Sequence, residues 1–186
     1  MGWTANYDND GFADLAIGAP FDDLASADNG LIAVVYGSSG GLSTADSDVL
    51  SELDAMVTPQ VRDYAGLALA SGRLDGNPYD DLLIGIPGRD FGGATDCGAM
   101  MSCHGRASGL IDPTAGPFRA LTNWFLQSAT PFGATNENLD LFGAAVAVGD
   151  FNGTGPAEAA IGAPGESLGS LAAAGAVFVG QIPPGS

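Results

Sequence analysis

The sequence contains no lysine and only five arginines against 22 aspartates and glutamates, so its formal net charge at pH 7 is −17. Such a chain repels the phosphates of nucleic acids and the headgroups of anionic membranes. Apolar runs are short as well, and none approaches the ~20 residues that a membrane-spanning helix needs. We therefore expect no nucleic-acid partner and no membrane insertion, and we expect the acidic groups to attract cations.

Cysteine and histidine are scarce, which limits thiol and imidazole chemistry. Cys97 and Cys103 fall along one predicted strand, where their Cα atoms would lie about 20 Å apart, beyond the reach of a disulfide. We expect two buried thiols and no intrachain disulfide. His104, the only histidine, stands at a strand end in the place that Tyr36 takes earlier in the chain. Without a second histidine or a chelating cysteine pair, the sequence does not predict a zinc site.

Helical periodicity is also scarce, and the best helical candidate, Ser47 to Val57, is short and fits a strand equally well. Instead, 29 glycines and 11 prolines separate short apolar runs. This pattern is typical of strands joined by tight turns, and 186 residues are enough for one domain with a sizeable core. The composition favours an all-β sandwich or propeller.

The segment from residue 6 to residue 14, here called the first loop, has the spacing of a metal-binding loop. A Ca²⁺ ion takes six to eight oxygen ligands at ~2.3–2.6 Å, and alternate residues of a tight loop can supply them. Gly11 occupies the sixth position, where the chain must reverse and where glycine adopts a positive φ at little cost. The predicted ligands are the side chains of Asn6, Asp8, Asp10 and Asp14 and the carbonyl of Phe12.

A loop of this composition has two alternatives to the predicted calcium site. An EF-hand requires a glutamate at its twelfth position and a helix after the loop, whereas here Ile17 takes that position and an apolar run ends at Pro20. An ion-free surface turn rich in Asp, Asn and Gly is the other alternative, and the recurrence of the pattern argues against it.

The first loop and the strand after it recur twice along the chain. Ile-Gly-x-Pro appears at residues 17–20, 84–87 and 161–164, each time after a loop of the same spacing. The third loop, residues 150–158, carries two charges instead of three, and its predicted ligands are Asp150, Asn152, Thr154, Glu158 and the Pro156 carbonyl. The second loop, residues 73–81, retains the weaker candidates Asp75, Asn77 and Asp81.

The second loop departs from the pattern at two positions. Arg73 replaces the first oxygen ligand, and Pro78 replaces the glycine at the turn. A guanidinium can pair with carboxylates where a metal would otherwise bind. Arg73 is therefore an alternative to a cation in this loop.

The third copy adds Phe142-Gly143 before the loop and Gly149-Asp150-Phe-Asn152-Gly within it. With these motifs the chain resembles the FG-GAP repeat family, which builds the β-propeller of integrin α-subunits and repeats in many secreted bacterial proteins. The resemblance implies an all-β β-propeller segment of about three blades, a partial propeller or arc. It implies one domain over residues 1–186, with units of approximately 1–60, 61–138 and 139–186.

The resemblance also implies a function. It points to a non-enzymatic, Ca²⁺-binding segment of an extracellular or cell-surface protein that serves recognition or adhesion, with a protein or carbohydrate ligand. The start, Met1-Gly-Trp, is not a signal peptide. An accessory segment of a secreted hydrolase and a structural spacer in a surface protein are the alternatives. Ser39 and Ser167 match a Gly-x-Ser-x-Gly pattern, but no convincing helix follows either serine, as a nucleophile elbow requires.

Propellers close with about four to eight blades, so three units leave two terminal sheets without neighbours. Exposed strand edges and apolar patches invite association. We expect self-association through the terminal blades. The apolar residues expected to be exposed there are Phe12, Ile17 and Val34 at one end and Phe151, Ile161 and Phe178 at the other.

Overall fold

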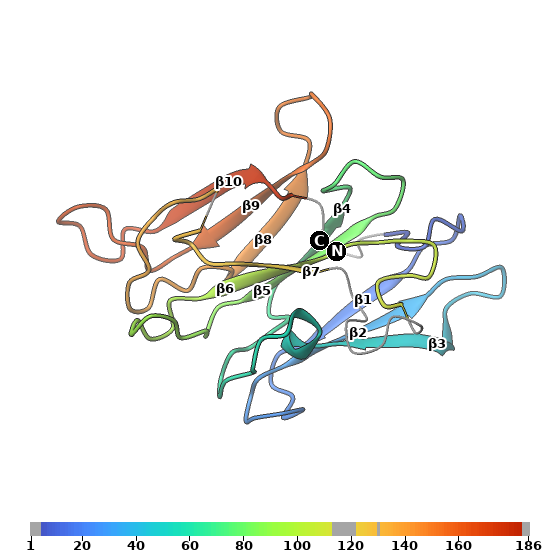
Figure 1. The fold of residues 1–186 in the computed structure, drawn as a ribbon, viewed down its shortest axis with the longest axis horizontal. Helices are drawn as coiled ribbons and strands as arrows, with labels where there is room; N and C mark the ends of the chain where they lie inside the picture. Colours follow the sequence, from blue (N-terminus) through green and yellow to red (C-terminus); the bar gives the residue numbers. More distant parts are fainter. Residues whose placement is uncertain (1–4, 113–121, 130, 184–186) are drawn as a thin grey trace.

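The computed structural model of the protein describes residues 5–112, 122–129 and 131–183, and Met1-Gly-Trp lies outside them. The strands form three antiparallel sheets (Figure 1). The first sheet contains β1 (Leu15–Ala19), β2 (Leu31–Tyr36) and β3 (Ser43–Leu50). The second contains β4 (Leu69–Gly72), β5 (Asp81–Ile86), β6 (Ala99–Cys103) and β7 (Thr122–Phe125). The third contains β8 (Ala145–Gly149), β9 (Glu158–Ala163) and β10 (Ala176–Gln181).

The expected all-β fold is confirmed. The short 3₁₀-helix η1 (Glu52–Ala55) is the only helix among the described residues, and it follows β3 where the sequence offered its best helical candidate. Within the same residues no helix is long and apolar enough to cross a membrane. Cys97 and Cys103 are both buried and free.

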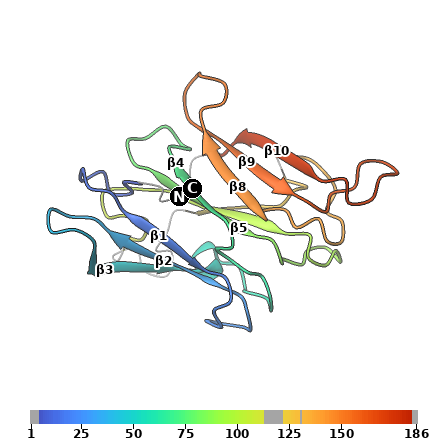
Figure 2. The same cartoon turned by 180° about the vertical axis from the view of Figure 1, so that it is seen from behind.

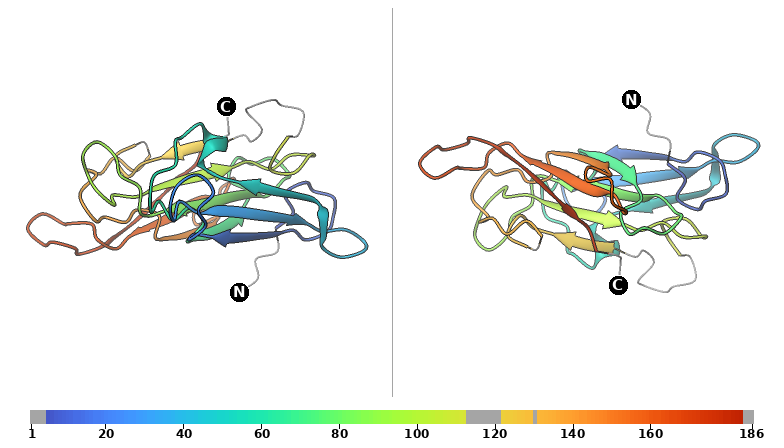
Figure 3. Two further views of the ribbon diagram at one scale, coloured as in Figure 1. Left: turned by 90° about the horizontal axis from the view of Figure 1, so that it is seen from below. Right: turned by 90° about the horizontal axis from the view of Figure 1, so that it is seen from above.

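The second sheet lies between the other two, as Figures 1 and 2 show from opposite sides. One buried cluster joins the first and second sheets, and another joins the second and third. The connections between β2 and β3 and between β9 and β10 extend from opposite ends of the molecule (Figure 3). The sheets thus form a row in which only the middle one has a neighbour on each face.

Strand β5 shows why this sheet is covered on both faces. Leu82, Ile84 and Ile86 belong to the cluster shared with the first sheet, whereas Leu83 belongs to the cluster shared with the third. Successive side chains of a strand point to opposite faces, so a strand buried on both faces is a continuous apolar run. All six residues of β5 are buried accordingly.

Glycine pairs set the distance between neighbouring sheets. A Cβ on Gly18 would lie 2.0 Å from the carbonyl oxygen of Gly66, and a Cβ on Gly85 would lie 2.0 Å from that of Gly143. Gly66 and Gly143 have φ of +86° and +93°. The Ile-Gly-x-Pro motif therefore meets Ala65-Gly66 across the first interface and Phe142-Gly143 across the second, and both glycines of each pair are needed for the close approach.

The same backbone hydrogen bonds recur at both interfaces. Ala65 and Phe142, the residues before Gly66 and Gly143, each donate the backbone N–H to a carbonyl two residues before an inner strand of the preceding sheet, β2 or β6. The eighth residue of each following loop donates to the carbonyl of the first residue of the loop before it. These bonds are Ala65 N to Asn29 O (2.9 Å), Phe142 N to Cys97 O (3.1 Å), Asp80 N to Asn6 O (3.1 Å) and Ala157 N to Arg73 O (2.8 Å).

A buried acidic cluster lies where η1 meets the second sheet. Arg89 Nη1 lies 3.1 Å from Asp63 Oδ2 and 3.6 Å from Glu52 Oε1. Both Glu52 oxygens are buried without a hydrogen-bond partner. Burial, followed by the neighbouring Asp63 carboxylate, raises the pKa of Glu52 to about 9, and Arg89 opposes this shift. The shift favours the protonated form of Glu52 in the folded chain.

We predict that Gly85→Ala lowers the free energy of unfolding by about 1–3 kcal/mol, because the new Cβ forces the second and third sheets apart. Gly162 is the matched control, since it holds the same motif position but no further sheet packs against it among the described residues. A Cβ there would lie 3.4 Å from the Ala145 Cβ, an ordinary contact. Gly162→Ala should change the free energy by less than about 0.5 kcal/mol in urea denaturation. Equal losses in both variants would contradict the proposed interface.

We predict that Glu52→Gln weakens the pH dependence of stability. The folded-state pKa of about 9 lies above the ordinary value of 4.5, so the folded chain keeps a proton that the unfolded chain releases between these values. The free energy of unfolding of the native sequence therefore falls as pH rises through this window. Urea denaturation at pH 5 and pH 8 should show a smaller fall for Glu52→Gln than for the exposed control Asp22→Asn. The same slope in both variants would show that Glu52 does not titrate in this way.

Candidate functional site

The three predicted loops lead into β1, β5 and β9, the strands that carry Ile-Gly-x-Pro. They lie along the same side of the molecule in Figures 1 and 2. The hydrogen bonds from Asp80 and Ala157 join consecutive loops. An ion bound in one loop would therefore be connected to the next loop through a backbone hydrogen bond.

The ninth-position carboxylate fixes each loop to its sheet. It accepts a hydrogen bond from the N–H of the loop's second residue, and in the first two loops also from the glycine that follows the next strand. These bonds are Tyr7 N to Asp14 Oδ2 (2.7 Å), Gly37 N to Asp14 Oδ1 (2.8 Å), Leu74 N to Asp81 Oδ2 (2.7 Å), Gly105 N to Asp81 Oδ1 (3.0 Å) and Phe151 N to Glu158 Oε2 (2.9 Å). These carboxylates are thus structural as well as potential ligands, because each oxygen has two lone pairs.

The third and fifth positions form Asx turns, in which a side-chain oxygen accepts from the N–H two residues ahead. The third loop lacks the second of these turns, because Pro156 at its seventh position has no N–H. The bonds are Asp8 Oδ1 to Asp10 N (3.1 Å), Asp10 Oδ1 to Phe12 N (2.8 Å), Asp75 Oδ1 to Asn77 N (3.0 Å), Asn77 Oδ1 to Tyr79 N (2.8 Å) and Asn152 Oδ1 to Thr154 N (2.8 Å).

The fourth position of every loop has a left-handed backbone. The φ values are 57° at Asn9, 78° at Gly76 and 70° at Gly153. The sequence predicts a reversal at the sixth position, and Gly11 there has a φ of 94°. Asn and Gly are the residues that tolerate this conformation best, and their recurrence at the fourth position was the missed signal.

The first loop offers only oxygen donors, and its carboxylates repel one another. Burial raises the pKa of Asp8, and the charge of Asp10 adds to the shift. Burial also raises the pKa of Asp14, with smaller contributions from both of these neighbours. Asn6 Oδ1 accepts a hydrogen bond from Asp10 N at 3.1 Å. Oxygen donors whose negative charges oppose one another fit a hard divalent cation such as Ca²⁺.

The third loop uses its predicted ligands to bond one another. Asp150 Oδ1 accepts from Gly153 N at 2.6 Å and from Thr154 N at 3.2 Å. Asn152 Nδ2 donates to Glu158 Oε1, and the Thr154 hydroxyl donates to Asn152 Oδ1. The donor set is again all oxygen, but an ion would have to displace more hydrogen bonds here than in the first loop.

The interpretation of Arg73 as the cation of the second loop is wrong. Its side chain is 61% exposed, and its Nε lies 3.7 Å from Asp80 Oδ1, a residue outside the predicted ligand set. His104 approaches the ligands instead, with Nδ1 3.5 Å from Asp75 Oδ2 and 3.4 Å from Asp81 Oδ1. Across the described ranges, this is the only place where three His, Cys, Asp or Glu side chains bring ligating atoms within 4.8 Å of one another.

A signal for this contact was present in the sequence. His104 precedes Gly105 as Tyr36 precedes Gly37, and the ninth-position carboxylates bind the N–H groups of these two glycines. The side chain before each glycine must therefore lie close to its loop.

The two hydrolase-like motifs have no catalytic surroundings. Ser39 lies in the turn between β2 and β3, so a strand follows it. Ser167 precedes a small bridge between Leu168 and Leu171 in the connection from β9 to β10. A nucleophile elbow requires a strand, a sharp turn and then a helix, and neither serine has this arrangement.

Comparison with known proteins finds similarity to proteins that contain the same kind of repeat. The sequence profile of the FG-GAP repeat matches residues 4–35, which include the first loop, β1 and most of β2. The chain is 39% identical to integrin alpha-5 of Xenopus laevis over 84 residues, 45% of this chain and 8% of that protein. It is 37% identical to integrin alpha-PS5 of Drosophila melanogaster over 83 residues, 44% of this chain and 8% of that protein.

A different kind of protein also matches. Phosphatidylinositol-glycan-specific phospholipase D of Bos taurus is 32% identical over 120 residues, 61% of this chain and 13% of that protein. The chain thus spans only 8% to 13% of the length of these three relatives. The profile match and the shared repeats lead to one conclusion: the chain contains an FG-GAP repeat at residues 4–35 and is similar to the repeats of integrin α-subunits over more than two fifths of its length.

Proposed function

We propose that this chain is a non-enzymatic, Ca²⁺-binding β-propeller segment of an extracellular or cell-surface protein, where it serves recognition or adhesion. The observation that carries the proposal is the first loop, in which mutually repelling carboxylates and all-oxygen donors are held by Asx turns. The acidic composition, with a net charge of −17, supports cation binding.

In this proposal the ion is held by Asn6, Asp8, Asp10, Asp14 and the Phe12 carbonyl. Bound Ca²⁺ supplies positive charge that offsets the repulsion between the carboxylates. Asp14 connects the ion site with the first sheet, because it accepts a hydrogen bond from Gly37 at the end of β2. The chain's own part is to hold the loop rigid at one side of the propeller while connections elsewhere contact a protein or carbohydrate ligand.

The third loop is a second and weaker Ca²⁺ site in this proposal. Its candidates are Asp150, Asn152, Thr154, Glu158 and the Pro156 carbonyl, with two formal charges among them. Affinity in such loops depends on charge count and rigidity. The second loop is not included, because it lacks an oxygen at its first position and has an imidazole nitrogen beside its carboxylates.

An accessory segment of a secreted hydrolase is the second candidate function. It is favoured by the similarity to phosphatidylinositol-glycan-specific phospholipase D over 61% of this chain. In that case the catalytic groups belong outside this chain, and its own role is again structural or binding. If none of its loops binds a ligand, the segment would instead be a structural spacer in a surface protein.

We predict that Ca²⁺ raises the melting temperature of the chain, because an ion that binds only the folded state stabilises it by mass action. At a free concentration of about 100 times the Kd, the gain is about 2.7 kcal/mol. The double variant Asp8→Asn, Asp10→Asn should lose most of this gain while keeping both Asx turns, since asparagine retains the Oδ1 acceptor. Differential scanning calorimetry in Ca²⁺ and in EGTA measures the difference.

The matched control is Asp22→Asn, Asp23→Asn, which removes the same charge from an exposed loop. It should keep the full response to Ca²⁺. If the native sequence melts at the same temperature in Ca²⁺ and in EGTA after exhaustive chelation, the first loop does not bind Ca²⁺. If both double variants lose the response equally, the effect is one of net charge and not of a site.

We also propose that the chain self-associates through its terminal sheets. Ile17 (46% exposed) and Val49 (53%) lie on the first sheet, and Val177 (70%) and Val179 (56%) lie on the third. Two of the residues expected to be exposed, Val34 and Ile161, are fully buried, because they face the second sheet. Phe12 and Phe151 are exposed as expected. Phe178 is partly buried against the cluster that joins the second and third sheets.

We predict that multi-angle light scattering shows dimers or larger species whose fraction rises with concentration. Val177→Thr together with Val179→Thr should shift the equilibrium toward the monomer, because the change makes the outer face of β10 more polar while keeping β-branched shapes. A native chain that stays monomeric at millimolar concentration would refute self-association.

A further inference from the structure

We propose that the second loop binds Zn²⁺ through His104 Nδ1, Asp75 and Asp81, in a site chemically distinct from the calcium loops. This inference goes beyond the proposed function, since it concerns another metal and a ligand from outside the loop. His104 belongs to the segment that follows β6, whereas Asp75 lies within the loop and Asp81 begins β5. The site therefore ties together two parts of the second sheet.

The distances match the geometry of a small tetrahedral site. His104 Nδ1 lies 3.5 Å from Asp75 Oδ2 and 3.4 Å from Asp81 Oδ1. Zn²⁺ binds nitrogen and carboxylate oxygen at ~2.0–2.2 Å, which places neighbouring tetrahedral ligand atoms about 3.4 Å apart. The three ligand atoms all lie within 4.8 Å of one another. A small side-chain adjustment would complete the triangle around one ion.

The imidazole nitrogen is an independent indication of a ligand. His104 is only 1% exposed, and its Nδ1 is a buried polar atom without a hydrogen-bond partner. Buried polar atoms are almost always paired, and an exception requires an explanation. Nδ1 faces two carboxylates at distances slightly too long or poorly aligned for hydrogen bonds, and a metal between them would satisfy all three groups.

The residues around the site hydrogen-bond to the three ligands and orient them, as the residues behind the ligands do in known metal sites. His104 Nε2 lies 3.2 Å from Ser102 Oγ, and this oxygen can accept a hydrogen bond from the Nε2–H group when Nδ1 binds metal. Asn123 Nδ2, which can only donate, lies 3.2 Å from Nε2 and donates to the Pro183 carbonyl at 2.8 Å; it can donate to Nε2 only while that nitrogen carries no proton, so in the metal-bound form its hydrogen bond to Pro183 remains. The Asp81 oxygens are fixed by backbone N–H groups, and Asp75 Oδ2 accepts from Asn77 Nδ2 at 2.8 Å.

The ligand chemistry favours Zn²⁺ over Ca²⁺. Ca²⁺ takes six to eight oxygens, whereas imidazole nitrogen suits Zn²⁺ and its neighbours in the first transition row. Arg73 removes the first oxygen of the calcium pattern, so the loop is also short of donors for Ca²⁺. The competing occupant is a proton on Nδ1, with Nε2 left free to accept from Asn123 Nδ2.

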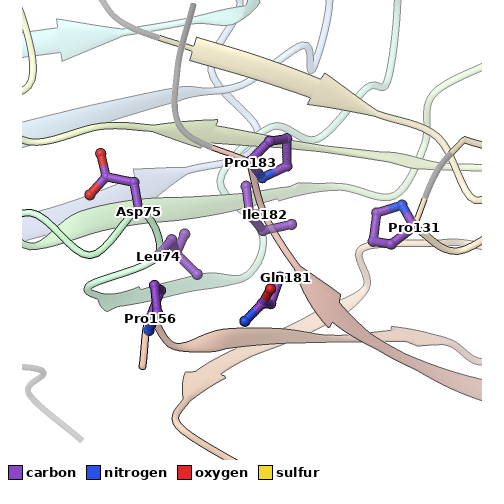
Figure 4. A pocket seen from close by; sticks show the side chains of 7 residues that line it. All are labelled: Leu74, Asp75, Pro131, Pro156, Gln181, Ile182 and Pro183. Carbon is purple, nitrogen blue, oxygen red and sulfur yellow. The ribbon is translucent and has the colours of Figure 1, made fainter. Parts of the chain in front are cut away.

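The site is accessible from solvent through Asp75. This residue lines a pocket between the second and third sheets, together with Leu74, Pro156 and Ile182. Figure 4 shows Asp75 at one end of the pocket and Pro131 at the other. An ion could enter by this pocket, and a water in it could take the fourth coordination position.

The test is isothermal titration of ZnCl₂ into the 186-residue chain in excess Ca²⁺, which fills any calcium sites first. We expect one equivalent of Zn²⁺ to bind. His104→Gln should weaken binding by about 100-fold or more, because it removes the nitrogen ligand. Asp75→Asn, at the solvent-accessible edge, should weaken it by at least about tenfold and is the second variant if His104→Gln does not fold. Substituting Co²⁺ should give the visible absorption of a tetrahedral nitrogen–oxygen site.

The double variant Asp8→Asn, Asp10→Asn is the matched control, and it should keep full Zn²⁺ binding even if it loses the response to Ca²⁺. This separates failure of the zinc site from failure of the calcium proposal. Absence of binding to the folded native chain would overturn the site and leave the proton on Nδ1 as the occupant. Binding unchanged in folded His104→Gln or Asp75→Asn would overturn it as well, since the ion would then bind elsewhere.

Discussion

The close approach of glycine backbones between neighbouring sheets is the constraint on which the rest of the structure depends. Gly18 meets Gly66 and Gly85 meets Gly143 at distances that no side chain would permit. This contact explains why both motifs of the repeat contain glycine. It also brings consecutive loops within hydrogen-bonding distance, so that Asp80 N reaches the carbonyl of Asn6. The metal chemistry proposed for the loops thus depends on packing at the opposite ends of the strands.

The ninth-position carboxylate connects this scaffold with the loops. Asp14 and Asp81 are buried and bind the backbone of both the loop and the next strand. Desolvating a carboxylate is costly unless hydrogen bonds compensate, and here the backbone N–H groups do so. A cation at the loop would add to the same compensation. In the second loop, the residue before the bonded glycine is His104, and its imidazole lies beside the carboxylates, whereas Tyr36 at the matching position bonds Asp48 instead.

Much of the fold was predictable because it rests on local patterns. The strands before and after each loop, the sixth-position turn at Gly11 and the repeat itself all follow from spacing. The contacts of Arg73 and His104 were not predicted, because they depend on how neighbouring strands are aligned. Val34 and Ile161 were wrongly expected to be exposed, because the sequence does not show which face of a terminal sheet meets the second sheet. The fourth-position reversal was visible as Asn9, Gly76 and Gly153 but required comparison of all three loops.

The central claim is that a cation holds the first loop rigid against β1 and β2. Amide hydrogen exchange measured by NMR tests it most directly, at the N–H groups of Tyr7, Gly37 and Phe12 that bond to loop carboxylates. Exchange reports the local opening of such hydrogen bonds. The account predicts that Ca²⁺ slows exchange at these three groups while leaving exchange in β5 and β6 unchanged. Equal exchange at Tyr7, Gly37 and Phe12 in Ca²⁺ and in EGTA would contradict it.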